Sequence, residues 1–215
     1  MGNIDENYFK MPTVKQNQSI DEIIGEGETL LLKVKPKKSA YIFNSIIKIL
    51  PLSIVWLIID AGFISSLAIT AAVPKTFWAF IIPFFAIHML PVWIGIVTII
   101  NASKSWKNLE YAFTERRIIL RSGVIGINIV NIYYADIKGV NLKIGFYDRM
   151  FKVGDIYISS AGKSQVLYDL ENPYFILERV QKLVLDLKTD VYFPNDLRPE
   201  SNSGYNTKYN SDNES

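Results

Sequence analysis

The residues from Phe77 to Ile100 form a stretch without a single formal charge. As an α-helix, a segment of this length covers roughly 36 Å at ~1.5 Å per residue, which exceeds the ~30 Å hydrocarbon core of a bilayer. Only His88 and Thr98 interrupt its apolar surface, whereas a helix on the core of a soluble protein usually keeps one polar face. The stretch therefore predicts a membrane-spanning helix over 77–100.

A second apolar stretch, from Ile42 to Val73, is broken only by Lys48 and Asp60 among the acidic and basic residues. It predicts a tilted helix over 43–67, with the Lys48 ammonium reaching the near interface. A short turn joins the two helices, so residues 43–100 are expected to form a transmembrane hairpin.

A hairpin that enters the membrane and returns without crossing it is the alternative. Pro51, Pro83 and Pro91 lie within the two apolar stretches, and proline bends helices because it lacks the backbone N–H and its ring crowds the preceding turn.

Basic residues gather at the outer ends of both predicted spans and are scarce between them. The flanking residues are Lys33, Lys35, Lys37, Lys38 and Lys48 before the first span, and Lys104, Lys107, Arg116, Arg117 and Arg121 after the second. Only Lys75 lies in the connecting turn. By the positive-inside rule, both termini and the segment after the second span are expected in the cytoplasm, with the chain integral to the plasma membrane.

Asp60 and His88 are ionisable residues inside the predicted spans, at similar depths on antiparallel neighbours. Two such residues could form an intramembrane polar pair, which is costly in lipid and often marks an ion or proton pathway. Alternatively, Asp60 stays in water near the outer surface, and His88 bonds a backbone carbonyl or another subunit. A channel or transporter built on this pair would require oligomerisation, since two helices cannot enclose a pore.

After Trp106 the apolar residues occur in short segments rich in Ile, Val and Tyr, separated by turn residues. The predicted strands are Leu109–Phe113, Arg117–Ser122, Ile127–Tyr134, Asp155–Ser160 and Gln165–Leu170. Strands at this spacing favour an antiparallel barrel or sandwich.

One helix is expected to close the region. Asn172 and Pro173 are typical of a helix start, and apolar residues then repeat with helical period from Ile176 to Leu187. A strand meander that ends in one amphipathic helix has the element order of a pleckstrin-homology (PH) barrel. The predicted fold class is therefore an α+β membrane protein, in which a transmembrane helical hairpin precedes a PH-like antiparallel β-barrel or sandwich capped by a C-terminal amphipathic helix.

A set of residues in this region follows an ordered pattern. Its members are Tyr111, Phe113, Thr114, Arg117, Gly123, Ile137, Val140, Phe146, Arg149, Phe151, Gly154, Ile156, Asn172 and Pro173. In order and spacing they resemble the bacterial PH-like domain of the YdbS-like membrane proteins, which commonly carry two membrane helices directly before that domain. The resemblance covers about 29–188 and implies a membrane-anchored PH-like domain.

Four basic residues are candidates for a binding patch: Lys138, Lys143, Arg149 and Lys152. Together they could bind anionic lipid head groups or an acidic partner, because each basic side chain near an anionic leaflet contributes about 1 kcal/mol. The alternative is structural: Arg149 bonds carbonyls, Asp148 or Asp155 and holds an irregular connection in place.

The sequence offers no catalytic constellation. It contains no cysteine and one histidine, which excludes thiolate chemistry and disfavours a multi-histidine metal centre or a Ser-His-Asp triad. No glycine-rich phosphate-binding motif is present, and a net charge of +2 does not indicate a nucleic-acid partner. We therefore expect a non-enzymatic protein without cofactor or metal.

The expected organisation has five parts. They are a polar N-terminal segment (1–28), a juxtamembrane segment (29–42), the hairpin (43–100), a cytoplasmic PH-like domain (107–190) and a disordered tail (194–215). Within the second part, Thr29–Val34 forms a short strand or leads into the first helix. The function expected is a scaffold or protein-interaction module with an unknown protein partner or a second copy of the chain, and the alternative is recognition of anionic lipid head groups.

Overall fold

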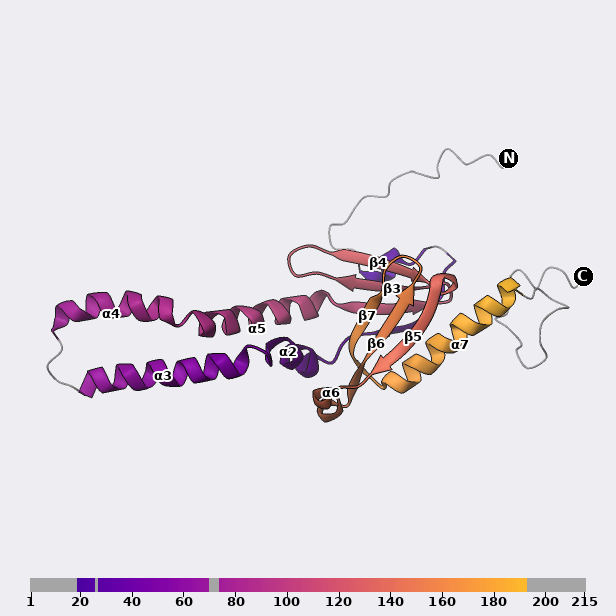
Figure 1. The fold of residues 1–215 in the computed structure, drawn as a ribbon. Coiled ribbons are helices and arrows are strands. Elements are labelled where there is room, and N and C mark those ends of the chain that lie inside the picture. The colour runs from indigo at the N-terminus through magenta and orange to yellow at the C-terminus, as the bar shows by residue number, and fades with distance from the viewer. Residues whose placement is uncertain (1–18, 26, 70–73, 193–215) are drawn as a thin grey trace, which may run out of the picture.

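The computed structural model describes residues 19–25, 27–69 and 74–192 (Figure 1). A long helical hairpin projects from one side of a small β-barrel, and the C-terminal helix lies along the barrel and points away from the hairpin. The predictions for most of the polar N-terminal segment and for the tail over 194–215 fall outside the described residues.

The first arm of the hairpin is two helices, α2 (Lys38–Ile46) and α3 (Leu50–Ile69). The prediction of one helix over 43–67 was therefore wrong. Pro51 explains the break at residues 47–49, because it has no N–H to donate and its ring would crowd the carbonyl of residue 47.

The second arm is also divided, into α4 (Lys75–His88) and α5 (Leu90–Asn108). Pro91, in the first turn of α5, cannot donate to the carbonyl of Ile87, so the chain bends at Met89. Pro83, by contrast, is accommodated inside α4. A single helix over 77–100 was thus also a wrong prediction.

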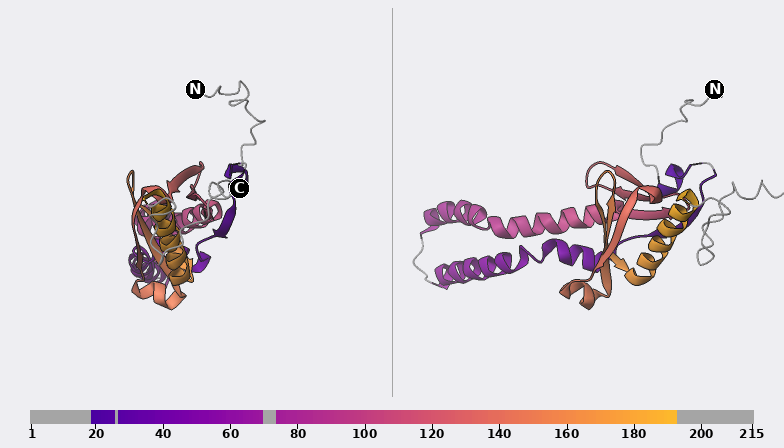
Figure 2. Two further views of the ribbon diagram at one scale, coloured as in Figure 1. Left: turned by 90° about the vertical axis from the view of Figure 1, so that its right-hand side faces the viewer. Right: turned by 45° about the vertical axis from the view of Figure 1, so that its right-hand side comes forward.

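Among the described helices, α3 alone is long and apolar enough to cross a membrane by itself. Residues 76–88 and 90–108 meet the same criterion only as a pair, with a bend of 50° between them. The two arms nevertheless run side by side, as Figure 1 and the right view of Figure 2 show.

The barrel consists of two antiparallel sheets, which confirms the α+β class with PH-like antiparallel sheets. The first sheet has the order β1 (Leu30–Val34), β2 (Glu110–Thr114), β3 (Arg117–Ser122) and β4 (Asn128–Tyr133). The second sheet has the order β5 (Ile137–Lys143), β6 (Val153–Ser160) and β7 (Gln165–Glu171). Of these strands, β5 and the early part of β6 were missing from the sequence prediction.

Strand β1 precedes the hairpin in sequence yet pairs with β2, which follows it; Val34 lies opposite Tyr111 and Leu30 opposite Thr114. The hairpin is therefore an insertion between the first two strands of the barrel. Residues 30–34 form part of the sheet, and the barrel is assembled from both sides of the hairpin.

Helix α7 (Pro173–Tyr192) closes the barrel core, with Ile176 and Val180 buried against residues from both sheets. Its first residue is the Pro173 that the sequence indicated. Two short helices complete the fold: α1 (Ile20–Ile23), whose Ile20 packs on Ala112 and Ile119 of the first sheet, and α6 (Phe146–Phe151) between β5 and β6.

Two residues of the family-like pattern hold the β2–β3 turn together. The Thr114 hydroxyl oxygen accepts the Arg117 N–H at 3.0 Å, and the Arg117 guanidinium pairs with the Glu28 carboxylate at 2.7 Å. The Tyr134 hydroxyl donates to the Thr114 carbonyl at 3.0 Å. These contacts are internal, so this part of the pattern stabilises the barrel.

Candidate functional site

Asp60 of α3 and His88, the last residue of α4, meet inside the hairpin. The Asp60 Oδ1 atom lies 2.9 Å from His88 Nδ1. The Asp60 side chain is only 1 % exposed, and its second oxygen, Oδ2, has no hydrogen-bond partner among the described residues. The structure thus brings the two predicted residues together and encloses the carboxylate between the arms rather than leaving it in water.

Aromatic side chains surround the imidazole of His88. The ring of Phe84 stacks on it, with centroids 5.3 Å apart, and that of Trp56 lies at 5.2 Å. The Trp56 indole also donates to the carbonyl of His88 at 2.7 Å. In an unbroken helix the amide of Val92 would bond this carbonyl, but that amide bonds Met89 instead. Trp56 therefore satisfies a polar group that the bend sets free.

A second polar contact joins the arms closer to the barrel. The Ser53 hydroxyl donates to the carbonyl of Pro91 at 2.8 Å. Facing it is Gly95, where an added Cβ would lie 2.9 Å from Ser53 Oγ. The glycine lets the arms approach closely, as small residues do where helices cross in membranes.

A cluster of carboxylates lies where the hairpin joins the barrel. Asn44 of α2 donates to Asp169 Oδ1 at 2.6 Å and to Asp148 Oδ1 at 3.2 Å. Asp155 accepts the backbone N–H of Asp169 at 2.9 Å, and the Asp169 carbonyl accepts the N–H of Lys37 at 2.9 Å. A single asparagine of the hairpin thus links two acidic residues of the barrel.

Burial raises the pKa of Asp169 to about 7, and the negative charge of Asp155 acts in the same direction. Burial is also the main reason why the pKa of Asp155 is raised. Asp169 is 2 % exposed and has a φ of 49°, in the left-handed region. Sequence reasoning missed this cluster because its members come from three separate elements and show no common spacing.

The four predicted basic residues are all exposed but do not form one patch. Lys138 is the second residue of β5 and Lys143 is the last, roughly 17 Å apart at ~3.4 Å per residue. Arg149 and Lys152, at the end of α6, line one hollow of about 370 Å³ together with Tyr174. Within residues 19–25, 27–69 and 74–192 the Arg149 side chain forms no hydrogen bond or ion pair, so the alternative structural role with Asp148 or Asp155 is not seen.

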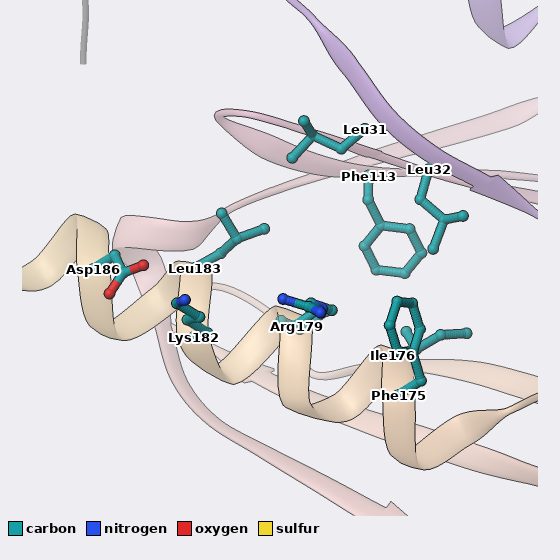
Figure 3. Close-up of a pocket in the computed structure, with 10 residues that line it drawn as sticks. Leu31, Leu32, Phe113, Phe175, Ile176, Arg179, Lys182, Leu183 and Asp186 are labelled. Atoms are coloured by element: carbon teal, nitrogen blue, oxygen red, sulfur yellow. The ribbon is translucent and has the colours of Figure 1, made fainter. Parts of the chain in front are cut away.

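An apolar groove lies between strand β1 and helix α7 and has a volume of about 440 Å³. Figure 3 shows Leu32 and Phe113 facing Ile176 and Leu183 across it. Arg179, Lys182 and Asp186 line the side formed by α7. Strand β1 is the outer strand of its sheet, so its free edge borders the groove. The leucine run at 30–32 is the sequence signal that could have indicated this surface.

Within the part of the chain that the structure describes, no group of three or more His, Asp or Glu residues could hold a metal ion. The geometry thus defines a polar joint inside the hairpin, a carboxylate cluster at its base, a basic hollow beside α6 and an apolar groove along β1.

The two antiparallel sheets and the closing helix α7 place these features in a protein of the PH-like barrel class. The family model described as Bacterial PH domain matches residues 49–189, and the chain belongs to this family. The matched residues include α3 to α5 as well as the barrel from β2 onward.

One solved structure is similar, that of a DUF1696 family protein with a pleckstrin-homology domain from Shewanella loihica PV-4. It shares 18 % sequence identity over 36 % of this chain and 68 % of that chain, with a TM-score of 0.28. No curated protein matches the chain significantly.

Proposed function

We propose that this protein is an integral membrane protein of the YdbS-like kind, a non-enzymatic scaffold that presents its PH-like barrel to a partner protein at the cytoplasmic face of the plasma membrane. The observation that carries the proposal is the outward face of the hairpin. Ile58 is 66 % exposed and Phe80 is 76 % exposed. In water, each such side chain would lack the roughly 1.5–3 kcal/mol of stabilisation that burial of an apolar side chain provides, whereas in a bilayer the lipid chains remove it from water.

The base of the hairpin carries the features of a cytoplasmic membrane boundary. Lys48 and Lys104 are exposed there, and Lys38 lies 5.4 Å from the ring of Trp106, whose indole donates to the Pro36 carbonyl at 2.8 Å. Tryptophan and lysine at one level are typical of the interface on the cytoplasmic side.

The groove between β1 and α7 is the surface that we assign to the partner. Its free strand edge can accept an extended segment, and its apolar floor can hold one or two apolar side chains of that segment. The partner is either another protein or a second copy of this chain.

Crosslinking of the intact protein in native membranes, followed by purification in mild detergent, tests this assignment. We expect a crosslinked complex that is lost in Leu31→Asp, because Leu31 is exposed and lines the groove. Leu185→Asp is the matched control, since Leu185 is also an exposed leucine, on α7, but does not line the groove. A complex that survives Leu31→Asp, or a strictly monomeric protein, would refute the groove as the partner site.

The second candidate function is binding of anionic lipid head groups by Arg149 and Lys152. The exposed hollow that these two residues line supports it, as does its place near the base of the hairpin. Native mass spectrometry of the protein released from anionic nanodiscs should show retained anionic lipid, with several-fold less in the Arg149→Gln/Lys152→Gln variant. Lys138→Gln is the control at the far end of β5, and equal lipid retention in all three proteins would exclude the role.

A further inference from the structure

Helix α6 places two apolar side chains in solvent beside the base of the hairpin. One of its faces packs on α2, where the rings of Tyr147 and Phe151 each lie 5.2 Å from that of Phe43. Phe146 and Met150, four residues apart and therefore on one face of the helix, are 81 % and 60 % exposed. Apart from an edge contact of the Phe146 ring with that of Tyr147, most of their surface is uncovered by the described residues, although α6 is attached to α2.

The turn between β3 and β4 is a second apolar projection. Val124 is exposed, and Ile125 at its tip is fully exposed. The turn is anchored to the end of α5, because the Asn108 side chain donates to the Gly123 carbonyl at 3.1 Å. Gly123 has a φ of 142°, and an added Cβ would collide with the Gly126 carbonyl oxygen. The shape of the turn is therefore set by its own backbone.

Both projections lie on the side of the barrel from which the hairpin leaves. Figures 1 and 2 show α6 on one flank of the hairpin and the β3–β4 turn on the other, with the turn reaching back along α5. Phe43 precedes the apolar helix α3 by seven positions, roughly 10 Å at ~1.5 Å per residue. The head-group zone of a leaflet is itself roughly 5–8 Å deep, so α6 lies at the outer edge of that zone when the hairpin spans, and apolar side chains that extend from it toward the bilayer reach the head groups.

The charges around these tips favour an anionic lipid surface over an acidic or neutral protein. Arg149 and Lys152 are exposed on and beside α6, and Lys48 and Lys104 are exposed on the hairpin arms between the two projections. The nearby carboxylate of Asp148 is buried and faces Asn44 and the Gly145 amide. Exposed apolar side chains with exposed basic residues on the same or a neighbouring element are the pattern of segments that insert into the interface.

We propose that α6 and the β3–β4 turn are two interfacial anchors, which insert Phe146, Met150 and Ile125 into the head-group region of the cytoplasmic leaflet on opposite flanks of the hairpin. The inference rests on the proposed membrane anchoring, and it adds the orientation of the barrel. With three points of attachment, the barrel cannot rotate freely about the hairpin axis.

The experiment uses single cysteines, which the chain permits because it contains none of its own. Ile125→Cys, Phe146→Cys, Phe80→Cys and Leu185→Cys are labelled with an environment-sensitive fluorophore in proteoliposomes that contain anionic lipid. Each label is then exposed to a water-soluble quencher and to a lipid carrying a quencher just below its head group. Phe80 reports on the hairpin, and Leu185 lies on the half of α7 that points away from it.

We expect the labels at 125 and 146 to be several-fold less accessible to the aqueous quencher than the label at 185, and to be quenched from the lipid. If both labels behave like that at 185 while the label at 80 is quenched from the lipid, the interfacial anchors are refuted and membrane anchoring stands. If the label at 80 is also in water, the proposed function fails as well. Protection from both quenchers at 125 and 146 would mean that protein covers the tips, which also overturns the proposal.

Discussion

Replacing Asp169 by asparagine should remove about half of the pH dependence of barrel stability between about pH 4 and pH 7. Asp169 is buried beside Asp155 and Asp148, and its pKa in the folded chain is about 7, against about 3.9 in an unfolded chain. Asparagine keeps the shape and still accepts the hydrogen bond from Asn44. It also tolerates the left-handed backbone at this position better than alanine would.

The sign follows from linkage. An acid whose pKa is raised by folding holds its proton more tightly in the folded state, so the free energy of unfolding falls as pH rises from about 4 and stops falling above about 7. The difference between these pKa values corresponds to at most about 4 kcal/mol. Because Asp155 and Asp169 titrate as a pair and the pair retains the Asp155 charge in the variant, we expect about 2 kcal/mol from the substitution.

The assay is urea unfolding of the intact chain in mild detergent at pH 4, 5.5, 7 and 8, with the circular dichroism signal of the sheets as the measure of folded protein. Asp169→Asn should match the parent protein at pH 4 and be about 2 kcal/mol more stable at pH 8. Glu178→Gln, an exposed acidic position on α7, is the control that should change neither value. Parallel pH profiles for the parent protein and Asp169→Asn would refute the argument, as would a less stable variant at pH 8.

Three further substitutions test other contacts by thermal or chemical unfolding in detergent. Gly95→Ala should destabilise the hairpin by about 1–2 kcal/mol, because the new Cβ would lie 2.9 Å from Ser53 Oγ. The control Gly62→Ala should be neutral or stabilising, because a Cβ at residue 62 would have no atom within 4 Å. Equal effects of the two substitutions on stability would contradict the close approach of the arms. Trp56→Phe should lower the free energy of unfolding by about 1–2 kcal/mol, because it leaves the His88 carbonyl without its hydrogen-bond donor. Phe63→Leu, on the same helix, is the control. A smaller loss of stability in Trp56→Phe than in Phe63→Leu would argue against this role of Trp56. Glu28→Gln should lower the free energy of unfolding by about 2 kcal/mol, since it leaves the half-buried guanidinium of Arg117 without its counter-charge. This loss of stability should persist at high salt if the ion pair is shielded from solvent.

Local signals predicted those elements whose pattern is contained in a few neighbouring residues. Strand β3 begins and ends at the residues expected, Arg117 and Ser122, because turn residues bound it on both sides. Helix α7 begins at Pro173 for the same reason. Strand β5 was missed because lysine, asparagine and glycine alternate with its three apolar residues, which weakens the apolar signal on which a strand prediction depends.

The parts of the candidate site that escaped prediction depend on contacts between distant residues. The pairing of β1 with β2 joins residues on opposite sides of the whole hairpin, and nothing local in 30–34 names its partner. The carboxylate cluster likewise needs Asn44 beside Asp148 and Asp169, more than a hundred residues later. By contrast, the possible pairing of Asp60 with His88 could be inferred from the sequence, because an antiparallel hairpin determines which residues of its two arms lie at the same level.

The insertion of the hairpin between β1 and β2 has a mechanical consequence for the groove between β1 and α7. Only residues 35–37 separate β1 from α2, and only Leu109 separates α5 from β2, so both arms continue almost directly into neighbouring strands of one sheet. The same β1 that precedes the first arm of the hairpin also borders the groove with α7, and α7 points away from the hairpin (Figure 1). If the hairpin spans a membrane as proposed, a protein segment bound at β1 would be reachable from the aqueous side while adding to the sheet from which both arms emerge. Binding there would stiffen the junction between barrel and hairpin, which is what the proposed assembly module requires.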